Sequence, residues 1–207
     1  IGSIFKYMSV ATALPLVVAV IYREWEMILP MASVPAVLFV LGMLLLRVPR
    51  EDREAPLSAA LMAVALIWLA IALVSALPFC LGLGVPYLDA FFEAMSGWTD
   101  TGLTVMRSVE DMPRTLLFWR SLMQWLGGIG IVAFTVAMAS RTGLTQFRLY
   151  RSEGRSEALM PSVVATGFEM WKIYLALTAV SIGLILLSGI PVWDAVNIAL
   201  VAIATGG

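Results

Sequence analysis

Long apolar stretches alternate with short polar segments along the chain. Each stretch is long enough for a helix that crosses a bilayer, which takes roughly 20 residues. The stretches cover residues 3–22, 27–46, 57–80, 115–138 and 168–188. The polar segments between them include a turn at 23–26 and charged loops at 47–56 and 140–165. This pattern predicts five membrane-crossing helices, the first two forming an N-terminal pair.

A second pattern occurs twice, from Gly84 to Gly102 and again from Gly189 to Gly207, an offset of 105 positions. Each copy follows an apolar stretch and reads as a tight turn, a short helix (90–98 or 195–203) and a Thr/Gly stretch. Short helices at matching places of an internal repeat indicate an ion or substrate site inside a membrane. Six of the 19 positions are identical: Gly84/Gly189, Pro86/Pro191, Asp89/Asp194, Ala90/Ala195, Ala94/Ala199 and Gly102/Gly207.

Asp89 and Asp194 each stand where a short helix is expected to begin. Asp is a favoured N-cap, because its carboxylate accepts the free N–H groups of the first turn. We expect both residues to cap the short helices. Direct contact with an ion, or an aspartyl centre of an intramembrane enzyme, are the alternatives.

The Thr/Gly stretches provide the candidate ion site. Each short helix is only about 14 Å long, so the backbone that follows it lies at membrane depth. Non-helical backbone is tolerated there only where protein buries it or a water-filled path runs beside it. Carbonyl oxygens along such a path can replace an ion's hydration shell, and glycine gives them close approach. The candidate residues are Asp100, Thr101, Gly102, Leu103 and Thr104 in the first copy, and Thr205, Gly206 and Gly207 in the second.

Composition agrees with a membrane setting. The chain is 61% hydrophobic and 13% charged, against about 45–50% and 25% in soluble domains. It has no His, and Cys80 is its one cysteine, which excludes an internal disulfide and a thiolate metal cluster. With a net charge of −1 and no basic stripe, nucleic-acid binding is not expected, nor is a covalently bound cofactor. Because the second copy stops at Gly207, we expect the chain to be a fragment.

Positive charge is distributed unevenly between the loops. Loops 47–56 and 140–165 contain most of the arginines, and such loops face the cytoplasm. Region 81–113 is then outside, where acidic side chains would concentrate cations at a pore mouth or would simply be loop polarity. The arginines are Arg47, Arg50, Arg53, Arg141, Arg148, Arg151 and Arg155, and the acids are Asp89, Glu93, Asp100, Glu110 and Asp111.

Three further features have simple structural interpretations. Gly127, Gly128 and Gly130 lie inside an apolar helix with no preceding strand, which favours close helix packing or a hinge over nucleotide binding. Arg120 is expected to extend toward the membrane interface. Most of five tryptophans are expected near the two interfaces, as in aromatic belts; they are Trp25, Trp98, Trp119, Trp125 and Trp193.

The residues of the first copy also carry a family resemblance. Phe91–Val105 (FFEAMSGWTDTGLTV) resembles the first pore loop of the TrkH/TrkG/KtrB superfamily of potassium transporters, and Trp119–Ile131 (WRSLMQWLGGIGI) resembles the helix after it. Leu149–Glu153 and Trp171–Tyr174 resemble the linker and the following helix. Ile203–Gly207 (IATGG) resembles the start of the second filter. Asp100 departs from the pattern, in which Thr is common.

The resemblance implies an all-α integral membrane protein of repeated helix–pore loop–helix units, like a K⁺ channel. The units would be an N-terminal helix pair with its loop (1–56), the first helix–pore-loop–helix unit (57–140), a cytoplasmic linker (141–167) and the start of a second unit (168–207). K⁺ would bind at Thr101, Gly102, Gly206 and Gly207. The family usually forms homodimers in the inner membrane, in contact with lipid and bound to a cytosolic nucleotide-binding subunit.

These observations predict an ion-conducting subunit that takes up K⁺ and carries out no covalent chemistry. A Na⁺-permeable or Na⁺/H⁺-coupled K⁺ transporter is the closest alternative. An intramembrane aspartyl enzyme and a purely structural subunit belong to other classes. Only the ion-conducting interpretation gives glycine at position 102 a special purpose.

Overall fold

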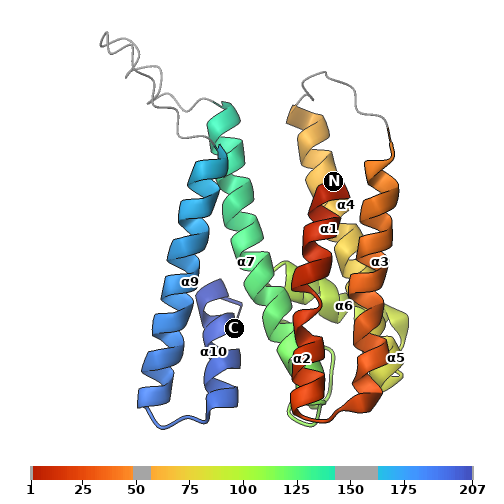
Figure 1. Cartoon of the computed structure of the whole chain (residues 1–207), viewed down its shortest axis with the longest axis vertical. Coiled ribbons are helices and arrows are strands. Elements are labelled where there is room, and N and C mark those ends of the chain that lie inside the picture. The colour runs from red at the N-terminus through yellow and green to blue at the C-terminus, as the bar shows by residue number, and fades with distance from the viewer. Residues whose placement is uncertain (1, 49–56, 143–162, 207) are drawn as a thin grey trace. The chain divides into compact units, whose positions relative to one another are not determined.

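The computed structural model describes residues 2–48, 57–142 and 163–206, and all regular structure in these ranges is helical (Figure 1). The prediction of an all-helical chain is therefore confirmed for the described residues. The helices are α1 (Gly2–Ala11), α2 (Leu14–Ile21), the 3-10 turn η1 (Trp25–Met27), α3 (Ile28–Leu46), α4 (Leu57–Ser75), α5 (Leu77–Leu83), α6 (Tyr87–Trp98), α7 (Arg114–Thr142), α9 (Val163–Leu187) and α10 (Val192–Ala204).

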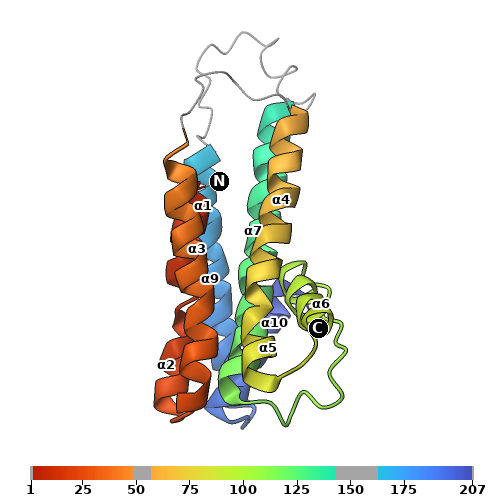
Figure 2. The ribbon, with the colours of Figure 1, turned by 90° about the vertical axis from the view of Figure 1, so that its right-hand side faces the viewer.

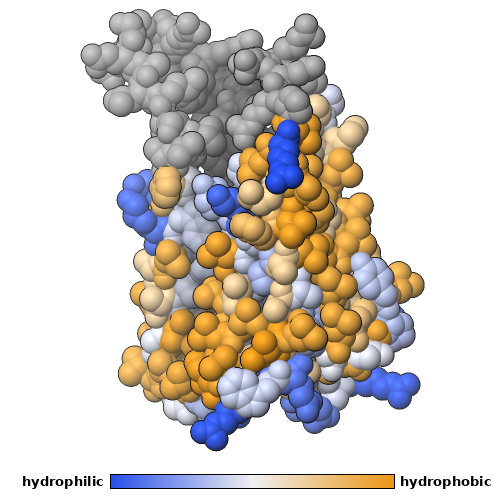
Figure 3. Space-filling model, turned by 45° about the vertical axis from the view of Figure 1, so that its right-hand side comes forward, coloured by the Kyte–Doolittle hydropathy of each residue, from blue (hydrophilic) through white to orange (hydrophobic). Residues whose placement is uncertain are grey.

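Four segments in the described ranges are long and apolar enough to cross a membrane: Gly2–Ile21, Trp25–Leu46, Leu61–Leu83 and Gly167–Leu187. They match four of the five predicted spans. The remaining predicted span falls on α7, whose 29 residues also exceed the length of a crossing; its side chains are described only as far as Ile131. Apolar side chains cover much of the face shown in Figure 3, as expected for helices that contact lipid.

Two of the predicted spans are interrupted. The first is divided into α1 and α2 by a turn at residues 12–13. The third is divided into α4 and α5 at Ala76, and Pro78 lies at the start of α5. Proline has no N–H to donate but fits a first helical turn, so a new helix begins there.

The chain separates into two units, Ile1–Gln124 and Trp125–Gly207. The finer division predicted from the sequence stays a prediction, and most of its linker 141–167 lies outside the described residues. In the first unit α1 packs on α3, and α4 packs on α6 (Figure 2). Gly2 and Gly42 permit the first of these contacts, since a Cβ on Gly2 would lie 2.9 Å from the Gly42 carbonyl oxygen.

Glu24 connects the N-terminal helices to the start of α7. Its Oε1 accepts a hydrogen bond from the Arg114 N–H at 2.8 Å, and its Oε2 accepts from the Thr115 N–H and hydroxyl at 2.9 and 2.6 Å. The Arg114 guanidinium also lies 4.4 Å from the centre of the Tyr22 ring. Glu24 therefore caps a helix that begins 90 residues later in the chain.

Two tryptophans, one at the end of α6 and one in α7, lie in the core of the first unit. Trp98 and Trp119 are almost fully buried, and their ring centres lie 6.3 Å apart in an edge-on arrangement. Their indole N–H groups donate to the hydroxyl and the carbonyl of Ser75, at 2.8 and 3.3 Å. The prediction that these two side chains belong to interfacial belts is therefore wrong. Each indole N–H has a partner inside the protein and needs no water.

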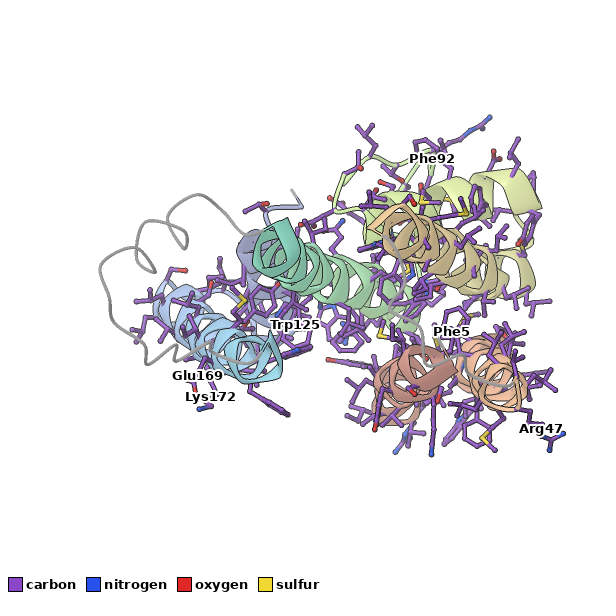
Figure 4. All side chains as sticks on the ribbon, turned by 90° about the horizontal axis from the view of Figure 1, so that it is seen from above. Phe5, Arg47, Phe92, Trp125, Glu169 and Lys172 are labelled. Atoms are coloured by element: carbon purple, nitrogen blue, oxygen red, sulfur yellow. The ribbon has the colours of Figure 1, made fainter. Side chains whose placement is uncertain are left out.

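In the second unit α10 packs on α9, and Trp125 of α7 contacts α9. The Trp125 indole N–H donates to the Thr178 hydroxyl at 3.0 Å, and the Tyr174 hydroxyl donates to the Trp125 carbonyl at 3.0 Å. Figure 4 shows Trp125 on the α9 side of α7. A Cβ on Gly128 would lie 3.1–3.2 Å from Tyr174 and Ala204. Close helix packing, one of the two interpretations of this glycine cluster, therefore holds at Gly128.

Candidate ion-binding loops

Both short helices begin directly after a proline. α6 starts at Tyr87 and α10 at Val192, and each is preceded by a proline. The two prolines have nearly the same backbone angles, with φ −54° and ψ 143° at Pro86 and φ −55° and ψ 147° at Pro191. Proline fixes its own φ and leaves the helix to begin at the next residue. The repeat seen in the sequence is therefore also a repeat of backbone geometry.

The predicted N-cap role of Asp89 and Asp194 is wrong. Neither helix has a side-chain hydrogen bond at its N-cap, and both aspartates lie within the first turn. The proline begins each helix three residues before its aspartate, which places the carboxylate past the capping position. Negative charge in a first turn still interacts favourably with the helix dipole.

The two helices also end in the same way. After α6, the Asp100 N–H donates to the Gly97 carbonyl at 3.1 Å and the Thr101 N–H donates to the Ser96 carbonyl at 3.0 Å. After α10, the Thr205 N–H donates to Ala202 at 3.1 Å and the Gly206 N–H donates to Val201 at 3.1 Å. This pair of bonds is the Schellman arrangement, which stops a helix and turns the chain sharply.

The Schellman turn places a left-handed residue at the start of each Thr/Gly stretch. These residues are Asp100, with φ of 59°, and Thr205, with φ of 64°. Glycine is the usual residue there, so both turns hold a side chain in a conformation that L-residues rarely adopt. Gly102 follows with φ of 74°, and Gly207 lies outside the described residues. We call residues 99–106 the first loop and residues 205–207 the second loop.

Side chains of α6 hold the first loop close to the helix. The Ser96 hydroxyl donates to the Leu103 carbonyl at 2.6 Å. The Thr99 and Thr101 hydroxyls lie 2.8 Å apart, and the former donates to the Met95 carbonyl. Leu103 itself is 60% exposed. The loop thus has one side bonded to its own helix while its other side is open.

The Glu93 carboxylate contacts both the first loop and α7. Its Oε1 accepts from the Thr104 hydroxyl at 2.6 Å and from the Val105 N–H at 2.7 Å. Its Oε2 lies 3.1 Å from Nη2 of Arg120 on α7. The Glu93 side chain has no exposed surface, and that of Arg120 is 15% exposed. Glu93 is therefore not part of an acidic surface, and Arg120 does not extend to the interface as predicted.

Sequence reasoning missed this pair because each residue was judged alone. A signal was present, since a charged residue within an apolar segment of a membrane protein generally has a partner of opposite charge. Glu93 and Arg120 are charged residues inside the two helices on either side of the loop, away from the helix ends. The Glu24 cap gave no such signal, because residues 23–26 have the composition of an ordinary turn.

Asp100 lies in the first loop, outside the four candidate membrane-crossing helices. Its Oδ1 is buried without a hydrogen-bond partner among the described residues. Burial raises the pKa of the Asp100 carboxyl to about 6. Its charge is thus sensitive to mildly acidic pH.

Comparisons with known proteins identify the family. The sequence matches the family described as TrkH, cation transport protein, over residues 34–207. The chain belongs to the TrkH family of cation transport proteins. An uncharacterized cation transporter of Methanocaldococcus jannaschii is 35% identical over 208 residues, covering 100% of this chain and 44% of the relative. The Trk system potassium uptake protein TrkH of Vibrio parahaemolyticus is 30% identical over 213 residues, with the same coverage.

The fold agrees with this membership. The crystal structure of the potassium transporter TrkH from Vibrio parahaemolyticus superposes with a TM-score of 0.81 at 28% identity, covering 96% of this chain and 40% of that one. The chain thus spans less than half the length of these TrkH-family relatives, in agreement with the expectation of a fragment. Within it, the described Thr/Gly residues lie where two equivalent helices end.

Proposed function

We propose that the full-length protein takes up K⁺ across the cell membrane along a path lined by backbone carbonyls of its pore loops. The first and second loops would supply part of that path, with K⁺ at Thr101, Gly102, Gly206 and Gly207. Neighbouring contributions would come from Asp100, Leu103, Thr104 and Thr205. Relatives in the TrkH family are named potassium uptake proteins, which supports this assignment.

The observation that carries the proposal is the identical Schellman turn at the C-terminal ends of α6 and α10. Two short helices at equivalent places of a repeat end in the same Schellman turn and continue into Thr/Gly backbone. Such a turn releases the chain from the helix, so that its carbonyl groups can face a path instead of the next helical turn. Repeated units that each provide one such segment can surround an ion on several sides.

A Na⁺-permeable or Na⁺/H⁺-coupled transporter uses the same architecture, and selectivity measurements separate it from a K⁺ pathway. An aspartyl enzyme has less support. Asp89 and Asp194 occupy equivalent first-turn positions, which the repeat explains without catalysis.

The proposed setting is the inner membrane, with lipid around the apolar helices. Loop 47–56 and residues 140–165 would face the cytoplasm and the pore loops the outside. A homodimer bound to a cytosolic nucleotide-binding subunit follows from the family resemblance. The arginine-rich segment proposed for that contact lies largely in 143–162, outside the described residues.

The test is ion uptake by the full-length protein in cells that lack their own K⁺ uptake systems. Restored growth at low K⁺ is the expected result for the unmodified protein. Gly102→Ser should lower the preference for K⁺ over Na⁺, because a side chain at a φ of 74° costs roughly 1–2 kcal/mol and shifts the loop carbonyls.

Gly183→Ser is the matched control, since a Cβ at this α9 glycine meets no atom of the described residues within 4 Å. Both variants are compared at equal membrane abundance. If the unmodified protein moves no K⁺, the proposed function fails. If Gly102→Ser keeps the full K⁺ preference, Gly102 has no part in the filter.

A further inference from the structure

A charged pair inside the first unit lies directly behind the first loop. The Glu93 carboxylate uses one oxygen for the loop and the other for Arg120. Its two loop contacts differ in kind, since one joins the Thr104 side chain and the other joins the Val105 backbone. The bond to the Val105 N–H restrains the main chain directly and does not depend on the side chains of the loop.

The geometry around Glu93 connects three segments. The carboxylate projects from α6, its partner Arg120 comes from α7, and the loop runs between them. The Thr104 hydroxyl also accepts from the Met106 N–H at 3.1 Å, so the hydrogen-bonded chain continues along the loop. With the Ser96 bond to the Leu103 carbonyl, consecutive residues 103–106 are each held directly or through Thr104.

The second short helix does not carry matching polar side chains. At the offset of the repeat, Glu93 corresponds to Ile198 and Ser96 corresponds to Val201. Ile198 is 46% exposed, and neither apolar side chain can accept or donate a hydrogen bond. The two helices end in the same turn, but of the two only α6 has polar side chains at these positions.

We propose that Glu93, held by Arg120, is a positioning residue that sets the ion preference of the first loop by fixing the backbone of residues 104–106. The carboxylate touches no ion; it acts on the carbonyl groups through Thr104 and Val105. Arg120 keeps it oriented, because a buried carboxylate needs a partner of opposite charge. The inference rests on the proposed function, since it concerns the same pathway.

The spacing of carbonyl oxygens around an ion depends on backbone position. A loop released at residues 104–106 can also shift at Gly102, which lies only two residues before Thr104. A K⁺ pathway built on defined oxygen positions then admits Na⁺ more readily. Loss of the Glu93 contacts should therefore change selectivity before it abolishes transport.

The experiment measures K⁺ and Na⁺ uptake by the full-length protein in cells lacking their own K⁺ systems. Glu93→Gln keeps an acceptor oxygen but removes the charge that pairs with Arg120. Thr104→Val leaves the buried ion pair intact and removes the link from Glu93 to the Thr104 side chain, together with the acceptor of the Met106 N–H. Each should lower the K⁺/Na⁺ preference by about tenfold, the equivalent of roughly one hydrogen bond in free energy.

Glu169→Gln is the control. Glu169 pairs with Lys172 at 2.6 Å on α9, but both side chains are about two-thirds exposed, and Figure 4 shows them on the outer side of that helix. The same substitution there breaks an ion pair without touching the loop, so selectivity should stay unchanged.

The outcomes separate this inference from the proposed function. If the unmodified protein restores K⁺ uptake and Thr104→Val keeps its full K⁺ preference at equal abundance, the positioning role is refuted while the transport function stands. If Glu93→Gln does not reach the membrane, Thr104→Val alone decides. Reduced preference in Thr104→Val together with an unaffected Glu169→Gln supports the inference.

Discussion

Asp100 and Thr205 occupy the same place in two copies of one backbone turn. Their φ angles are 59° and 64°, and each donates its N–H at 3.1 Å to the carbonyl three residues earlier. Aspartate and threonine differ in charge, but the backbone geometry of the two turns is nearly the same. Thr205 therefore serves as an internal example of how threonine fits at position 100.

Asp100→Thr should leave transport running in the full-length protein. Threonine already adopts this left-handed conformation in the second copy, so the turn should persist. Losing the carboxylate should weaken apparent K⁺ affinity by about fivefold, as expected for roughly 1 kcal/mol between a charge and an ion in a water-filled path. The concentration dependence of uptake gives this value. Complete loss of uptake with normal expression would show that Asp100 does more than adjust cation entry.

Apparent K⁺ affinity should also depend on external pH through Asp100. Burial raises the pKa of this carboxyl to about 6, so it is ionised at pH 7 and mostly protonated at pH 5. The affinity should therefore be highest above pH 6 and should fall as pH decreases through 6. Asp100→Thr removes the titrating group. A pH profile between 5 and 7 that is the same in both proteins would exclude Asp100 as its source.

Removing the Glu24 cap should destabilise the first unit. Glu24→Ala leaves two N–H groups and a hydroxyl at the start of α7 without their acceptor, a loss of about 1–2 kcal/mol. The Tm of the purified full-length protein should fall by several degrees. Glu26→Ala, at an exposed neighbour in η1, is the control. Equal Tm values for the two variants would mean that the cap adds no stability.

Membrane orientation can be tested at the two ends of the first unit. Arg47, labelled in Figure 4, follows the C-terminal end of α3, whereas Arg107 lies in the loop before α7; both are exposed. In a Cys80→Ser background, Arg107→Cys should react with an impermeant thiol reagent added outside, and Arg47→Cys should react only after permeabilisation. External labelling of Arg47→Cys in intact cells would show that the proposed orientation is wrong.

The helices and the repeat could be predicted from the sequence because both depend on local pattern. Apolar length alone located the spans, and the spacing of Pro86 and Gly102 reappears at Pro191 and Gly207. The capping prediction for Asp89 failed by three residues, since proline, not aspartate, determines where α6 begins. The proline signal for a helix start took precedence over the aspartate signal three residues later.

The contacts between segments could not be predicted in the same way. Glu93 and Arg120 are 27 positions apart in the sequence, and the local sequence around each residue does not indicate its ion-pair partner. Trp98 resembled an interfacial residue because composition does not reveal that Ser75 offers it a buried partner. Pairing is a property of tertiary packing, and it became visible only with the helices in place.

The contact between Glu24 and Thr115 has a consequence for the order of synthesis. Ribosomes add about 5–20 residues each second, so Glu24 is made roughly 5 to 20 seconds before the helix that it caps. The N-terminal helices have then left the ribosome while the start of α7 is still to come. Glu24 is therefore already available as an acceptor when the start of α7 is synthesised.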